Sequence, residues 1–193
     1  MAPLIMRLRR FSIRLLSILL AMILTACTAP LFDQQPTADS PSTARSHFKE
    51  IVLDEAKITF GQTVYVPIYS YIYYYDSQKH LINLAATLSI RNTDLRHPII
   101  ITAIGYYNTS GQLVEKYLDK PSELSALASA DFFIKQNDVT GGLGANFIVE
   151  WVAEKTVSQP VIEAVLISTE SGRGISLLSP GRVIQQRGTK KLS

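Results

Sequence analysis

The chain has 193 residues, of which 47% are hydrophobic and 18% are charged, and it contains one cysteine. It has 19 lysine and arginine residues and 16 aspartate and glutamate residues. Four of the arginines and no acidic residue precede Cys27, so the chain from Cys27 onward has 15 basic and 16 acidic residues. A nearly neutral chain without a basic cluster excludes a nucleic-acid-binding role. A lone cysteine excludes an intrachain disulfide framework and a multi-thiolate metal site.

The first 27 residues have the order of features expected of an export signal. Four arginines come first, and an apolar run over 15–24 follows them. This run is well short of the roughly 20 residues that a helix needs to cross a bilayer. It is therefore typical of a signal-peptide core. The alternative is an uncleaved N-terminal anchor.

The leader ends in Leu-Thr-Ala-Cys at residues 24–27. This tetrapeptide resembles the lipobox of bacterial lipoproteins. The resemblance implies that residues 1–26 are a signal peptide removed before Cys27, and that Cys27 carries the acyl chains that hold the protein on a membrane. Residue 28 is threonine, whereas an aspartate there resembles an inner-membrane retention signal, so the resemblance favours an outer-membrane anchor facing the periplasm.

Composition predicts how the rest of the chain is divided. Residues 27–45 contain three prolines among many Ser, Thr, Asp and Gln residues, which predicts a flexible, lipid-anchored linker. Fully extended, this linker would reach at most about 60 Å. Residues 46–186 contain no repeat and no second linker, so we expect one domain there. Residues 187–193 are predicted to be a disordered tail.

Hydrophobic and polar residues alternate through most of the predicted domain, which is the period of a half-buried β-strand. Over 82–90 the alternation places five apolar residues on one face, and over 146–154 it places Phe147, Val149 and Trp151 inward. We therefore predict an all-β fold, an Ig-like β-sandwich of about eight strands, with a small β-barrel as the alternative. Residues 122–130 are the one stretch whose pattern fits a short helix.

The segment over 64–75 is rich in tyrosine. Read as one strand, it has an apolar face at its even positions, and its odd positions carry Tyr65, Tyr69, Tyr71, Tyr73 and Tyr75. Pro67 cannot donate to a ladder, so we expect this strand at a sheet edge or a bulge. Tyrosine offers contact area at low entropic cost, and these five residues are our candidate surface for binding an envelope protein or a glycan. Packing of the tyrosines across strands is the alternative.

No motif of a catalytic, cofactor or metal site occurs in the sequence. Gly-x-Ser-x-Gly, His-Glu-x-x-His and Cys-x-x-Cys are all missing. His47, His80 and His97 are too far apart in sequence to suggest a metal pair. The glycines within 141–144 precede a predicted strand, so they indicate a turn and not a phosphate cradle. We assign no catalytic residue, no metal and no cofactor.

Four segments together resemble a known family. They read GQTVYVPIYSYIYY, LSIRNTD, GGLGANFIVEW and GISLLSPGRVI, and they lie within residues 61–184. They are similar to a family of bacterial envelope lipoproteins of unknown function, found in cyanobacteria and proteobacteria. The resemblance implies an exported, lipid-anchored domain and assigns no catalytic or binding residue.

Two functions remain open at this point. The first is a monomeric, non-enzymatic binding or assembly module held in the cell envelope by lipid on Cys27. The second is an envelope hydrolase with a carboxylate pair assembled by the fold, for which Asp94, Asp138 and Glu150 are candidates. A pocket with two carboxylates within about 10 Å would favour the hydrolase, and an exposed aromatic surface would favour binding.

Overall fold

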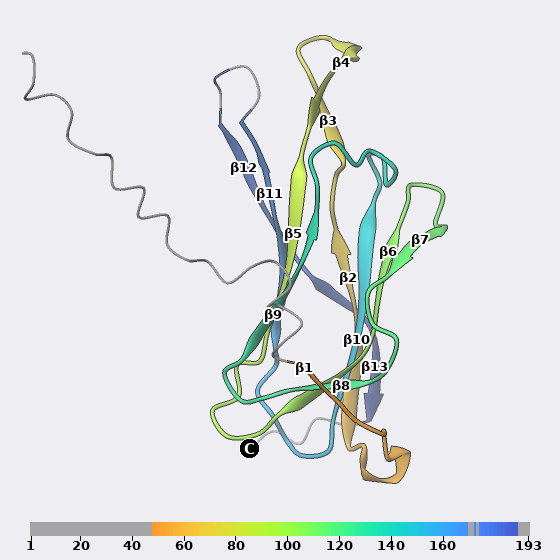
Figure 1. The fold of residues 1–193 in the computed structure, drawn as a ribbon, viewed down its shortest axis with the longest axis vertical. Helices are drawn as coiled ribbons and strands as arrows, with labels where there is room; N and C mark the ends of the chain where they lie inside the picture. The colour runs from red at the N-terminus through yellow and green to blue at the C-terminus, as the bar shows by residue number, and fades with distance from the viewer. Residues whose placement is uncertain (1–47, 170–171, 173, 189–193) are drawn as a thin grey trace, which may run out of the picture. The chain divides into compact units, whose positions relative to one another are not determined.

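The computed structural model describes residues 48–169, 172 and 174–188, which form thirteen strands and one 3₁₀ helix (Figure 1). The expected signal peptide, Cys27, the linker and His47 lie outside these residues. The helix is η2 (Glu55–Lys57), and the strands are β1 (Phe48–Glu50), β2 (Phe60–Pro67), β3 (Tyr71–Tyr74), β4 (Ser77–Asn83), β5 (Ala85–Arg91), β6 (Ile99–Tyr107), β7 (Leu113–Lys116), β8 (Ser122–Leu124), β9 (Ser129–Ile134), β10 (Asn146–Ala153), β11 (Val161–Ser168), β12 (Ile175–Pro180) and β13 (Arg182–Gly188). Within the described residues, no helix is both long and apolar enough to span a bilayer.

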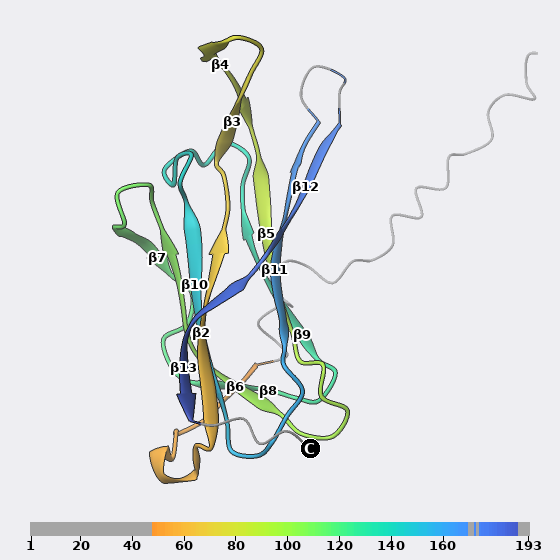
Figure 2. The same cartoon turned by 180° about the vertical axis from the view of Figure 1, so that it is seen from behind.

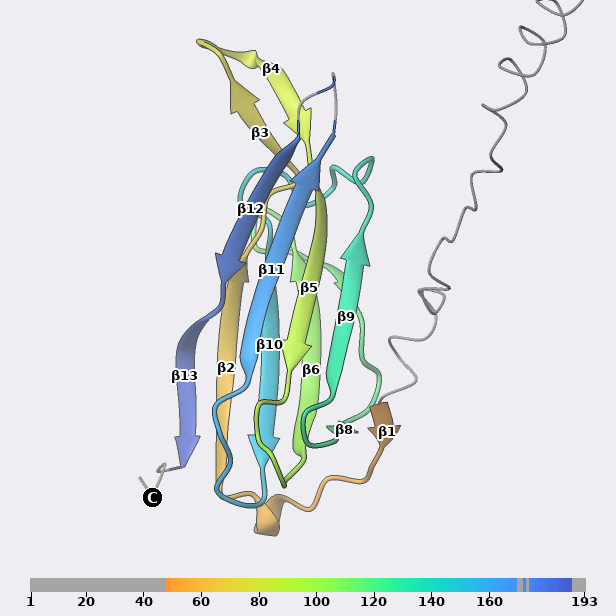
Figure 3. The same cartoon turned by 90° about the vertical axis from the view of Figure 1, so that its left-hand side faces the viewer.

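The strands form two separate antiparallel sheets and one hairpin. Sheet 1 has the order β1-β8-β6-β10-β2-β13 with β7 added on β6, and sheet 2 has the order β12-β11-β5-β9. The hairpin β3-β4 pairs with neither sheet. The sheets pack face to face, as Figure 3 shows with sheet 2 in front. The predicted all-β sandwich is therefore confirmed, and the two sheets do not close into a barrel.

The core lies between the sheets and follows the predicted alternation. Phe147, Val149 and Trp151 of β10 are buried, and Trp151 is only 1% exposed. The Trp151 indole packs against the ring of Phe60 with centroids 5.6 Å apart. From the facing sheet, β5 contributes the buried side chain of Leu88. Period-two patterning thus correctly identified the inward faces of these central strands.

Strand β2 lies between β10 and β13, so the expected edge position is wrong, and the bulge in the pairing of β2 with β13 lies opposite Thr63 and Val64 and not at Pro67. Pro67 is the last residue of β2, and the pairing of β2 with β13 begins at Tyr65 opposite Arg182. The missing N–H therefore costs no ladder bond to β13. The Pro67 carbonyl instead accepts a hydrogen bond from Ser179 Oγ at 2.5 Å.

The short helix expected over 122–130 is also not formed. Residues 122–124 are strand β8, and Leu127 adopts a φ of 59° in the turn that follows. Asn92 Nδ2 donates to the carbonyl oxygens of Leu124 at 3.1 Å and Ser125 at 3.0 Å. These carbonyls would be the acceptors of a first helical turn. A side chain about thirty residues away in the sequence thus holds this segment in a turn.

The last strands run from one sheet to the other, as Figure 2 shows for β12 and β13. Gly181 lies at this crossing, where its N–H donates to the Ile162 carbonyl oxygen at 2.8 Å. A Cβ at Gly181 would lie 2.5 Å from the same oxygen, so glycine is required for this close approach. Strand β13 continues through Arg187 and Gly188, two residues that we expected in the tail.

Candidate functional site

The β3-β4 hairpin projects beyond the ends of both sheets (Figures 1 and 3). Its base is fixed at Ser70, whose N–H donates to the Gly142 carbonyl oxygen at 3.0 Å and whose carbonyl accepts from Leu84 N–H at 2.9 Å. The cross-strand pair Ile72 and Ile82 packs partly against the core. The base of the hairpin is therefore anchored in the sandwich, whereas its tip lies outside both sheets.

Exposed tyrosines occupy the free part of the hairpin. The rings of Tyr71 and Tyr73 are 6.1 Å apart, as expected for residues i and i+2 on one face of a strand. Tyr73 is 42% exposed and lies opposite Leu81, which is 44% exposed. Tyr75 is 76% exposed at the turn. The predicted residues Tyr71, Tyr73 and Tyr75 therefore lie on one projecting element.

The other two predicted tyrosines lie elsewhere. Tyr65 is on β2 within sheet 1, where it pairs with Ile148 and Arg182 and is half-buried. Tyr69 lies in the connection between β2 and β3 and is 37% exposed. The segment over 64–75 is thus two strands joined at an angle, and only its second half belongs to the hairpin.

Two further aromatic residues belong to the hairpin and were missed by the sequence analysis. The ring of Tyr74 lies 4.9 Å from that of Tyr75 and 5.4 Å from that of His80. The pairing of β3 with β4 shifts between Tyr73 and Tyr74, so Tyr74 does not follow the simple alternation. No local pattern predicts this shift. The histidine on the strand that follows the tyrosine-rich turn was nevertheless a visible signal that a further aromatic ring belongs to the hairpin.

The three carboxylates considered for a hydrolase occupy different parts of the fold. Asp94 follows β5 at one end of the sandwich, and Asp138 follows β9 at the other end. Glu150 lies on the outer face of sheet 1, in the middle of β10. The fold therefore does not bring these three residues together.

Two of these carboxylates stabilise loops. Asp94 accepts backbone N–H bonds from Arg96, Ser158 and His97, which lower its pKa to about 2. Asp138 Oδ1 accepts the backbone N–H of Thr140 at 3.0 Å. Within the described residues, no three His, Cys, Asp or Glu side chains converge closely enough to hold a metal ion.

Comparisons with known proteins identify a family. The structure called "Crystal Structure of Thermotoga maritima 1070" resembles the chain at 12% sequence identity with a TM-score of 0.40, covering 63% of this chain and 92% of that chain. No curated protein sequence matches. The family model described as "protein of unknown function (DUF3124)" matches residues 61–184, the segment expected to carry the family resemblance. The chain therefore belongs to the DUF3124 family, a family of unknown function.

Proposed function

We propose that the protein is a lipid-anchored component of the bacterial cell envelope and acts as a non-enzymatic binding module. The observation that supports this function is the β3-β4 hairpin, which pairs with neither sheet and carries the exposed side chains of Tyr73, Tyr75 and Leu81. Aromatic rings with hydroxyl tips are enriched where proteins contact one another. The hairpin is the proposed contact surface for an envelope protein or a glycan.

The backbone at Tyr75 supports this proposal. Tyr75 has a φ of 56°, in the left-handed region that glycine, asparagine and aspartate occupy at lower cost. A bulky residue in that conformation costs of order 1–3 kcal/mol, and such outliers cluster at functional sites. The side chain of Tyr75 is 76% exposed, so burial does not repay this cost. A contact made by the exposed ring would explain why tyrosine occupies the turn.

No observation on the described residues favours the alternative hydrolase. A glycosidase or related enzyme needs two carboxylates on either side of the scissile bond. Asp94 holds two loops together through its hydrogen bonds, and Asp138 holds a turn. The described residues therefore support a binding module better than they support a hydrolase.

The anchor is tested by intact mass measurement of the protein extracted from membranes. We expect a chain that begins at Cys27 and carries acyl groups, because charge, apolar core and lipobox-like sequence occur in the order that export requires. Cys27→Ser should release the protein from the membrane. Recovery of residues 1–26 on the mature chain, or full membrane retention of Cys27→Ser, would contradict the anchor.

The hairpin is tested by placing a photo-crosslinking amino acid at position 75 and, as a control, at position 133. Phe133 is also aromatic and is 51% exposed, but it lies on the outer face of sheet 2. We expect a discrete adduct in native envelopes from position 75 only. In the wild-type background, Tyr73→Ser should remove the contact while changing the free energy of unfolding by no more than about 0.5 kcal/mol.

Two outcomes would contradict the hairpin proposal. Equal crosslinking from positions 75 and 133 would indicate a nonspecific contact. Loss of several kcal/mol of stability in Tyr73→Ser would indicate that the ring is needed for packing.

A further inference from the structure

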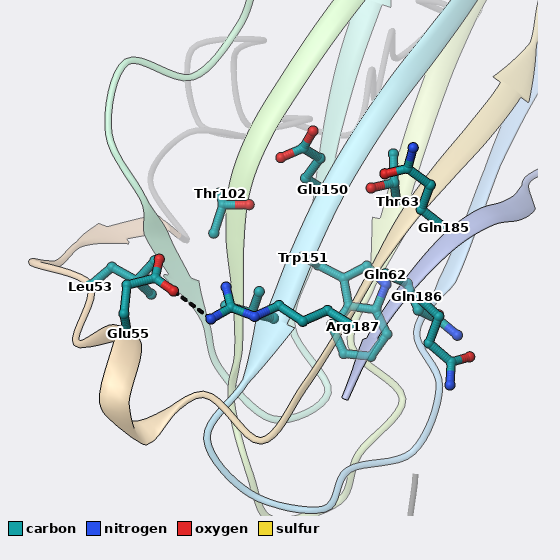
Figure 4. A pocket seen from close by; sticks show the side chains of 12 residues that line it. Leu53, Glu55, Gln62, Thr63, Thr102, Glu150, Trp151, Gln185, Gln186 and Arg187 are labelled. Atoms are coloured by element: carbon teal, nitrogen blue, oxygen red, sulfur yellow. Dashed lines mark ion pairs between the residues drawn. The ribbon is translucent and has the colours of Figure 1, made fainter. Parts of the chain in front are cut away.

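A groove lies on the outer face of sheet 1, on the side that does not face sheet 2 (Figure 4). Its volume is about 360 Å³. Gly61 of β2 and Val152 of β10 are cross-strand neighbours beneath it. Leu53 and Glu55, from the segment between β1 and β2, border one end, and Arg187 of β13 extends across the groove toward Glu55.

Two β-bulges flank the groove. The pairing of β10 with β6 shifts after Glu150, which leaves Thr102 as an extra residue on β6. The pairing of β13 with β2 shifts before Gln185, opposite Thr63. Bulges bend strands and redirect side chains, and they occur frequently beside binding sites. Gln185, Thr63 and Glu150 are cross-strand neighbours, and this row of side chains lies between the two bulges.

Glycine at position 61 keeps the groove open. A Cβ there would lie 2.8 Å from Val152 Cγ1 and 2.9 Å from the Trp151 carbonyl oxygen. Any larger residue would therefore both strain the strand and fill the space above it. The neighbouring side chain on β13 is Arg187, which reaches Glu55 Oε2 at 2.7 Å. The Arg187 side chain extends across the groove to make this ion pair, and Gly61 and Val152 beneath the groove are both buried.

Five polar side chains that line the groove have no hydrogen bond or ion pair to any residue that the structure describes. They are Thr63, Thr102, Glu150, Gln185 and Gln186. Beneath them, Gln62 Oε1 and Trp151 Nε1 are buried and also have no partner within the described part of the chain. The lining therefore offers hydroxyl, amide and carboxylate groups that can both donate and accept hydrogen bonds.

The charges of the groove decide which class of ligand fits. Among the described residues that line the groove, Arg187 is the one cationic side chain and is already paired with Glu55, and Glu150 adds a second negative charge, which disfavours an anion. A polar lining disfavours an apolar ligand, because the polar groups would lose their water without replacement. A sugar hydroxyl donates and accepts at once and matches threonine and glutamine side chains.

We infer that this groove is a binding site for a neutral saccharide. The hydroxyls of the sugar would bond the side chains of Thr63, Thr102 and Glu150, beside the ion pair of Arg187 with Glu55. The site is separate from the hairpin, since it lies on β2, β6, β10 and β13 and uses none of the hairpin's tyrosines. Its failure would leave the hairpin proposal unaffected.

The test is calorimetric titration of the purified full chain in a detergent without a sugar headgroup. The probes are a tetramer of N-acetylglucosamine and a tetramer of glucose. Thr63→Val and Thr102→Val keep the branched shape of each side chain and remove its hydroxyl, so the strands should be retained. We expect the double variant to weaken binding about tenfold, since two hydrogen bonds are lost.

Thr87→Val is the matched control, because Thr87 is a half-buried threonine on β5 in sheet 2. This variant and Tyr73→Ser should bind the saccharide as the wild type does. If the double threonine variant is unfolded by circular dichroism, Glu150→Ala provides the same comparison, because it removes the carboxylate acceptor from an exposed position. No heat from either tetramer with the wild-type chain would overturn the inference. An equal loss in Thr87→Val, or unchanged affinity in the groove variants, would overturn it as well.

Discussion

Replacing Asp94 with asparagine should remove an acid-sensitive part of the protein's stability. Asp94 Oδ1 accepts the N–H groups of Arg96 at 2.9 Å and His97 at 2.8 Å, and Oδ2 accepts that of Ser158 at 2.9 Å. The carboxylate thus connects the β5-β6 loop to the β10-β11 loop. Its side chain is 12% exposed, and His97 Nδ1 lies 3.5 Å from Oδ1.

The magnitude follows from the pKa of Asp94. The N–H bonds from Arg96, Ser158 and His97 lower this pKa from 3.8 to about 2. Because the folded pKa is the lower one, the stabilisation is fully present above the unfolded value and is lost as the pH falls from about 4 to about 2. A difference of nearly two pKa units corresponds to about 2.5 kcal/mol. Asparagine keeps the shape but presents only one acceptor oxygen to three donors.

Urea unfolding of wild type and Asp94→Asn over a pH series measures this effect. At pH 7 we expect the variant to be less stable by about 2.5 kcal/mol, and this difference should shrink toward pH 2 as the wild-type carboxylate becomes protonated. Asp131→Asn is the matched control, since Asp131 is exposed on β9 and has no partner among the described residues. Its stability difference should stay small at every pH.

If wild type and Asp94→Asn differ in stability by the same amount at pH 7 and at pH 2, the role of the Asp94 charge is refuted. A variant as stable as wild type at pH 7 would refute it too, because the three N–H bonds would then contribute nothing that depends on the charge. In either case the two loops would be held by the neighbouring hydrogen bond that Thr93 Oγ1 donates to the Gln159 carbonyl oxygen at 2.8 Å.

Core and turn substitutions give further expected outcomes. Trp151→Ala should cost about 3–5 kcal/mol in thermal or urea unfolding, since the indole is 1% exposed and packs on Phe60, and a loss below about 1 kcal/mol would contradict its place in the core. Gly141→Ala should cost about 1–3 kcal/mol, because its Cβ would clash with the Tyr106 hydroxyl and lie 2.7 Å from Ala145 Cβ. Gly111→Ala should cost about 1 kcal/mol through its φ of 75° alone, as nothing lies near its Cβ. Because Gly141 does not have a positive φ, an unchanged stability of Gly141→Ala would show that the contact with Tyr106 adds nothing.

Local pattern determined the fold class and the inward faces of the strands. Burial of alternate residues requires only that successive side chains point to opposite sides of a strand, which is a property of adjacent residues. Phe147, Val149 and Trp151 are therefore buried as their spacing predicts. Composition also sufficed to place the exposed tyrosines in one segment, because no other part of the chain is so rich in them.

The local pattern could not predict which strands pair with one another. An interior strand can end in proline when its neighbour is shorter, as at Pro67, and a helix-like pattern can be held in a turn by a distant side chain, as at Asn92. The number of strands was underestimated for the same reason. Residues 64–75 read as one strand but contain parts of β2 in sheet 1 and β3 in the hairpin, and residues 82–90 contain the end of β4 in the hairpin and most of β5 in sheet 2.

The sequence by itself determined an all-β sandwich, its core faces and a tyrosine-rich segment. Only the tertiary structure decided that this segment turns away from sheet 1 at Ser70, because the bonds that fix the turn come from Gly142 and Leu84. Only the tertiary structure formed the groove, since Thr63 and Glu150 become neighbours through strand pairing and the bulges depend on register. Alternation is set by adjacent residues, whereas register and surface shape are set by contacts between residues far apart in the chain.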